Sequence, residues 1–143
     1  MFAVAEMLKK QKEETTEFQN MVLRGIHWLA NARAQFAREN ELLSLMTCLE
    51  TYFSPPTHRD IKATLAQGVA RVLGQEQEHQ AYLTQRIRDF YKARSELSHG
   101  GYKAVTSDDL VELREIVRNT TAWMIVNQDR LTDKKALLKW VRA

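Results

Sequence analysis

Apolar residues recur every three or four positions along most of this chain, and that spacing favours helices. The clearest run places five residues on one stripe of a helix: Leu83, Ile87, Phe90, Arg94 and Leu97. No segment alternates between apolar and polar residues for long enough to predict a strand. The expected fold class is therefore all-α, a bundle of four or more helices with short connections.

The other helices are expected at about 20–36, 41–53, 61–73, 107–128 and 131–142. Three starts carry capping signals, at Asn40, at Thr57 with Asp60, and at Thr106 with Asp109. Gly100-Gly101 supplies the residue type that tolerates left-handed backbone after a helix end. The helix that bears Arg94 is therefore expected to run from Gln75 to this glycine pair.

The length and the apolar fraction of 44% are those of one globular domain with a real core. Residues 1–19 are expected to form an N-terminal helical or linker extension, and residues 20–143 the helical domain. Phe36 is expected on the apolar stripe of the first helix of that domain. Cys48 is the only cysteine, and its apolar neighbours predict that it packs in the core.

Arg94 occupies a stripe position that an apolar side chain normally fills. Burying a guanidinium without a partner costs about several kcal/mol of folding free energy. An anionic ligand or a carboxylate must therefore compensate the charge. Glu50 is a candidate supporting residue as a counter-ion, although a solvated charge is the simpler interpretation of its position.

His99 follows at the expected end of the same helix. An arginine beside a titratable imidazole can clamp a phosphate and move a proton at one place, which suits cleavage of RNA. A histidine at a helix C-terminus is also favoured by the helix dipole alone. Both interpretations of His99 stay open.

The net charge of +3 is mild, but residues 86–103 carry all of the excess. The candidate RNA-binding cations of this segment are Arg86, Arg88, Lys92 and Lys103. Such a patch suits a polyanion, while a solvated helix face is the commoner explanation of a charge cluster.

The sequence predicts no cofactor, no metal site and no membrane segment. The four histidines lack metal-ligand spacing, and the apolar part of the N-terminus is too short for a signal peptide or a membrane span. A single cysteine is consistent with a reducing compartment, so we expect a cytoplasmic protein.

Residues Phe90–Gly101 resemble the signature of a known family, the higher eukaryotes and prokaryotes nucleotide-binding (HEPN) superfamily, closest to its Apea-like branch. The preceding Cys48–Phe53 and the following Asp108–Arg114 support the resemblance, which covers residues 20–128. In this family the residue after the arginine is often Asn, Asp or His. Ser95 stands there in this chain and retains a hydrogen-bonding group.

The resemblance implies a helical bundle that dimerises and brings two arginine–histidine motifs to one cleft. It implies metal-independent endoribonuclease activity on RNA, with Arg94 and His99 as the catalytic pair and Ser95 as a supporting residue. Phage defence or toxin-like RNA cleavage would be the setting, with an antitoxin or a larger defence-system protein as the partner. The alternative is an inactive HEPN module that dimerises or binds nucleic acid or nucleotide, in which Arg94 pairs with Glu50 and His99 only caps its helix.

Overall fold

The computed structural model describes residues 14–57, 59–100 and 105–143, and within these ranges every regular element is an α-helix. The helices are α2 (Glu17–Arg33), α3 (Arg38–Phe53), α4 (Ile61–Leu73), α5 (Gln77–Ser98), α6 (Ser107–Val126) and α7 (Lys134–Arg142). The all-α bundle predicted from the sequence is thus confirmed.

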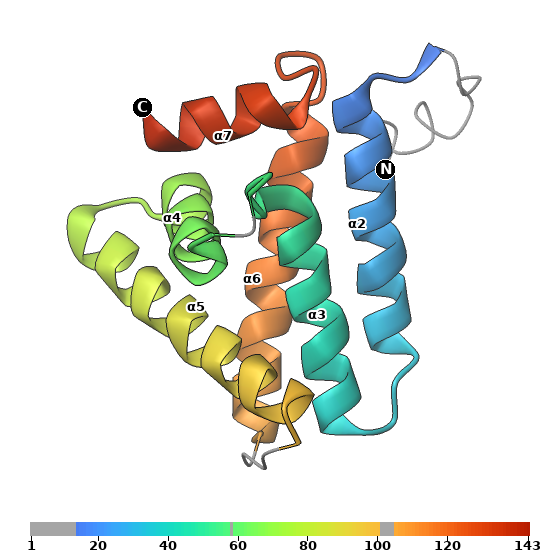
Figure 1. Ribbon diagram of the computed structural model, residues 1–143, viewed down its shortest axis with the longest axis vertical. Helices are drawn as coiled ribbons and strands as arrows, with labels where there is room; N and C mark the ends of the chain where they lie inside the picture. Colours follow the sequence, from blue (N-terminus) through green and yellow to red (C-terminus); the bar gives the residue numbers. More distant parts are fainter. Residues whose placement is uncertain (1–13, 58, 101–104) are drawn as a thin grey trace.

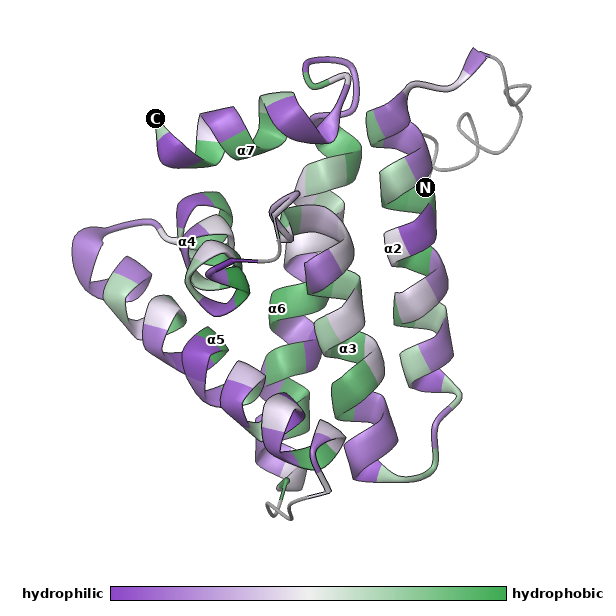
Figure 2. Ribbon diagram, viewed as in Figure 1, coloured by the Kyte–Doolittle hydropathy of each residue, from purple (hydrophilic) through white to green (hydrophobic). Residues whose placement is uncertain are grey.

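Helices α2, α3 and α6 run side by side along the length of the molecule (Figure 1). Helix α5 packs most extensively on α4 and crosses toward α3, and α7 lies across one end of the bundle. Figure 2 shows α5 as largely hydrophilic, while much of α3 and α6 is hydrophobic. The core therefore centres on α3 and α6, and α5 covers it with one apolar stripe.

Cap chemistry explains where several helices begin and end. Thr106 and Asp109 form the predicted capping box, with reciprocal bonds of 3.0 and 3.2 Å. Thr16 forms a second box with Gln19. Gly100 has φ of +78°, a left-handed conformation that disfavours side-chain-bearing residues, so α5 ends at the predicted place.

One predicted start and one predicted capping box were wrong. Helix α3 begins at Arg38 with Ala37 as its N-cap, three residues before the predicted cap at Asn40. Thr57 and Asp60 form no capping box, because Asp60 is itself the residue before α4 and adopts a left-handed φ of 54° without a side-chain cap. The residues that α3 gains before its expected start, Arg38, Glu39 and Asn40, are not buried, so apolar packing does not explain the earlier start.

The first described helix also differs from the prediction. It begins at Glu17 instead of Asn20, and it buries Phe18 completely, so residues of the expected extension belong to the core. It ends at Arg33, and the helical phase that would carry Phe36 inward is therefore lost. Phe36 is fully exposed, contrary to its predicted place in the core. Residues 1–13 of the predicted extension lie outside the described ranges.

Cys48 is buried in α3, as predicted, and its thiol donates to the carbonyl of Gly25 at 3.2 Å. Burial raises the pKa of Cys48 from 9.0 to about 11, although hydrogen bonds with Tyr52 and Thr121 act in the opposite direction. A thiol reacts as its thiolate, and this shift lowers the thiolate fraction at pH 8 by about a hundredfold.

We therefore expect iodoacetamide to alkylate Cys48 at least about a hundredfold more slowly at pH 8 in the native protein than in denaturant. The modified fraction is read by mass spectrometry. Equal rates in the two conditions would show that this part of α3 is not packed as described.

Candidate functional site

The C-terminal half of α5 is positioned by its apolar stripe. Leu83, Ile87 and Phe90 are buried and anchor the helix on the core. The next stripe position is Arg94, whose side chain is 27% exposed. Burial along the stripe therefore decreases at this residue, and the guanidinium lies at the edge of the core.

Glu50 of α3 faces this guanidinium. Its Oε1 lies 2.6 Å from Nε of Arg94, and both atoms are shielded from solvent. The N–H is not aligned on the oxygen as a hydrogen bond would require, so the contact is an ion pair. Glu50 is therefore the counter-ion of Arg94, the less favoured of the two interpretations of its position in the sequence.

The charge of Arg94 offsets only part of the cost of burying the Glu50 carboxylate. Burial raises the pKa of Glu50 above its ordinary value, and the opposing charge of Arg94 reduces this shift without cancelling it. The terminal nitrogens of Arg94 donate no hydrogen bond to any residue within the described ranges. Arg94 thus retains donors for a second anion.

His99 is the C-cap residue of α5 and is exposed. Its Nδ1 lies 2.8 Å from the backbone oxygen of Ser95, and its backbone N–H donates to the same oxygen at 3.1 Å. A carbonyl oxygen only accepts, so Nδ1 carries the proton and Nε2 of the neutral ring has a lone pair. The helix end therefore fixes the tautomer of an exposed base.

The contribution of Ser95 comes from its backbone. Its hydroxyl makes no hydrogen bond to a residue in the parts of the chain that the structure describes. The carbonyl that holds His99 is present in every residue type. The serine at this position is therefore compatible with the observed orientation of the imidazole.

Arg94 and His99 of one chain form no hydrogen bond with each other within the described ranges. Arg94 pairs with Glu50 of α3, while the ring of His99 bonds to the backbone of its own helix. The two groups therefore have different partners within a single chain.

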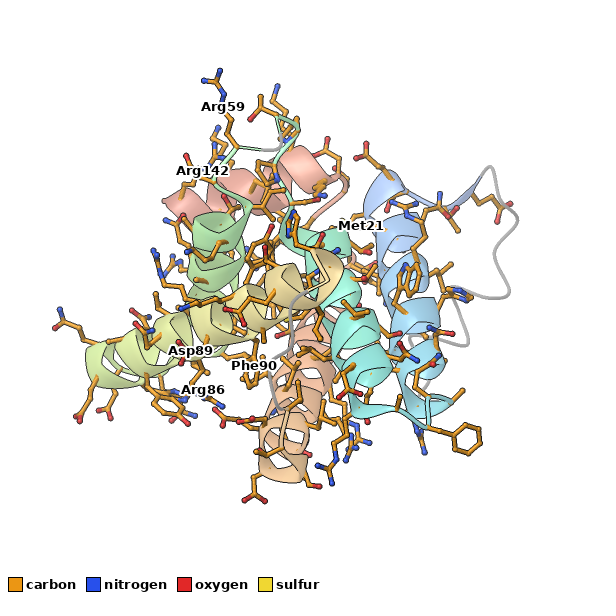
Figure 3. All side chains as sticks on the ribbon, turned by 60° about the horizontal axis from the view of Figure 1, so that its bottom comes forward. Met21, Arg59, Arg86, Asp89, Phe90 and Arg142 are labelled. Carbon is orange, nitrogen blue, oxygen red and sulfur yellow. The ribbon has the colours of Figure 1, made fainter. Side chains whose placement is uncertain are left out.

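Arg86 is committed to carboxylates. Its guanidinium pairs with Asp89 at 3.4 Å, Asp109 at 3.1 Å and Glu112 at 3.0 Å, and it lies 4.5 Å from the ring centre of Phe90 (Figure 3). Hydrogen bonding to Glu112 raises the pKa of Arg86. Burial would raise the pKa of Asp109, but bonds from Thr106 and Arg86 lower it overall. Arg86 therefore joins α5 to α6 and is poorly placed to bind RNA.

The other predicted cations differ in their surroundings. Arg88 and Lys92 are exposed on α5, and neither forms an ion pair with a residue of the described ranges. Lys103 lies outside those ranges.

The three-carboxylate network around Arg86 was not predicted. The spacing of Asp109 and Glu112 on one face of their helix was visible, but its contact with α5 depends on the tertiary fold.

The described residues offer neither a membrane span nor a metal site. No helix there is both long and apolar enough to span a membrane. No group of three or more His, Cys, Asp or Glu side chains in these ranges is arranged to hold a metal ion.

Comparisons with protein-family models, with curated proteins and with solved structures found no match to this chain. The resemblance to the HEPN superfamily stays a prediction.

Proposed function

We propose that this chain is a metal-independent endoribonuclease whose site is completed when two copies associate. The observation that carries the proposal is the state of His99, an exposed imidazole whose Nδ1 is held by a backbone carbonyl at 2.8 Å. This arrangement directs the basic Nε2 away from the helix end that holds the ring. General acid–base catalysis needs such a positioned group that can accept or donate a proton.

Arg94 supplies the second requirement. Its Nε is occupied by Glu50, which fixes the guanidinium at the edge of the core. Its terminal nitrogens are then available for a phosphate, whose charge rises as the phosphorane forms. The exposed Arg88 and Lys92 on the same helix add positive charge along the path of an RNA backbone.

Association of two copies would join the two groups in one site. A two-fold axis near the end of α5 would bring Arg94 of one copy and His99 of the other to one phosphate. The ribose 2′-oxygen then attacks phosphorus, and the bond from phosphorus to the 5′-oxygen breaks. His99 accepts the 2′-hydroxyl proton while water protonates the leaving 5′-oxygen, or protonated His99 donates to the 5′-oxygen while water takes up the 2′-hydroxyl proton. Arg94 stabilises the phosphorane. The products are a 2′,3′-cyclic phosphate and a 5′-hydroxyl.

A second candidate is a module without catalysis that dimerises or binds nucleic acid or nucleotide. It is favoured by the fact that each group already has a partner within one chain. Arg94 pairs with Glu50, and His99 caps α5. On this account the two residues stabilise the helix end, and RNA is bound without being cut or is not bound at all.

Incubation with labelled mixed-sequence RNA in EDTA separates the two candidates. The ribonuclease is expected to release fragments with 2′,3′-cyclic phosphate ends, identified by end-group analysis after acid or phosphatase treatment. The oligomeric state is measured in the same samples by light scattering. Intact RNA in the presence of folded dimers would favour the binding module.

A further inference from the structure

A pocket of about 940 Å³ opens between the α3–α4 connection and α7. Pro55, Pro56 and Leu138 contribute to a wall that is mostly apolar. A pocket of this size and character is typical of sites for small molecules, which combine an apolar wall with a few placed polar groups.

Lys134 provides such a polar group. It is half-buried, and its Nζ donates to the hydroxyl of Ser54 at 2.9 Å. No carboxylate within the described ranges forms an ion pair with this ammonium, although the Glu17 carboxylate accepts a hydrogen bond from the backbone N–H of Lys134 at 3.5 Å. Burial lowers the pKa of Lys134, the charge of Arg24 lowers it further, and Glu17 acts in the opposite direction. The ammonium is thus a partly desolvated cation whose hydrogen-bond partner is neutral.

The rim of the pocket is positively charged, like Lys134 inside it. Lys135, Lys139 and Arg142 are exposed among its lining residues, whereas Glu17 is the one acidic side chain of that set. Figure 3 places Arg142 and Arg59 at the same end of the molecule. The aliphatic stems of these side chains can cover an apolar ligand while their charges stay in water. The pocket therefore combines an apolar wall with a positive mouth.

We propose that this pocket binds an amphiphilic anion, a small molecule with one carboxylate or phosphate group and an apolar body. The anionic group would pair with Lys134 and Ser54, and the apolar body would lie against Pro55, Pro56 and Leu138. A carboxylate or phosphate at Lys134 would pair directly with the ammonium, which Glu17 does not do. The proposal uses none of the residues assigned to RNA cleavage, so it stands or fails independently of the ribonuclease.

The test is an NMR titration of the full chain with decanoate as the probe. Saturable shifts are expected at the amides of Ser54 and of residues 134–139, with smaller effects elsewhere. Inorganic phosphate lacks the apolar body, and decyltrimethylammonium carries the wrong charge, so each should bind at least about tenfold more weakly.

Lys134→Met removes the charge and keeps most of the side-chain volume, and it should weaken decanoate binding about tenfold. Lys62→Met is the matched control, because Lys62 is exposed on α4 and does not line the pocket. Equal affinity of the two variants, equal binding of the cationic probe, or largest shifts outside the pocket in the wild-type protein would each overturn the proposal. The last readout needs no variant and so does not depend on the folding of Lys134→Met.

Discussion

His99→Ala is expected to lower the rate of RNA cleavage by about two to four orders of magnitude, the range in which general acid–base groups contribute. The substitution removes the basic Nε2 and leaves the Arg94–Glu50 pair in place. The rate is measured as fragment release from labelled RNA in EDTA.

The fold should survive this change. His99 is exposed, and its side chain contributes one capping bond and a favourable place at the helix end, together worth about 1 kcal/mol or less. His79→Ala is the matched control, since His79 lies on the same helix and its Nδ1 also has one backbone partner, the N–H of Gln75 at 3.4 Å. Cleavage that persists in His99→Ala, or falls equally in both variants, would remove His99 from the mechanism.

Arg94→Ala is expected to lower cleavage by about two to three orders of magnitude, as removal of a group that stabilises transition-state charge does. It should also destabilise the fold by about 1–2 kcal/mol, because Glu50 is left half-buried without its counter-ion. Loss of activity alone would therefore not separate catalysis from folding.

The charge-swapped variant Glu50→Arg/Arg94→Glu separates the two roles. It restores an ion pair between α3 and α5, so it should be more stable in urea than either single substitution. It leaves a carboxylate where the phosphate-binding guanidinium stood, so cleavage should stay at the level of Arg94→Ala. Recovery of cleavage together with stability would mean that Arg94 acts only by holding the helix.

The course of the helices could be predicted from the sequence wherever one local signal decided it. The Thr106–Asp109 box and the left-handed Gly100 are local features, and both were found as predicted. The exposure of Phe36 depends on where α2 ends and on which faces find an apolar partner, and spacing alone does not contain that information.

In the candidate site, too, local features could be predicted from the sequence and tertiary contacts could not. A guanidinium on an apolar stripe requires compensation, and this predicted that Arg94 has an anionic partner. Sequence alone could not choose between Glu50 and a ligand, because residues 44 positions apart meet only through the packing of α3 against α5. Arg86 was predicted as an RNA-binding cation, but in the structure it pairs with carboxylates that come largely from α6. Sequence spacing could not show this contact between two helices.

The pocket beside α7 was not predicted at all. Its basic residues lie within 134–142 and are visible in the sequence, but Pro55 and Pro56 of its apolar wall come from the connection after α3. Only the folded chain brings these two segments together.

A mixing experiment tests the central claim, that Arg94 and His99 act together at a site shared by two copies. Arg94→Ala and His99→Ala are each expected to be inactive. When they are combined and allowed to exchange, their heterodimers retain one Arg94 and one His99. The mixture is expected to cleave RNA in EDTA well above either variant alone, in proportion to the heterodimers counted by native mass spectrometry. A mixture that contains heterodimers and remains as inactive as its components would contradict the shared site.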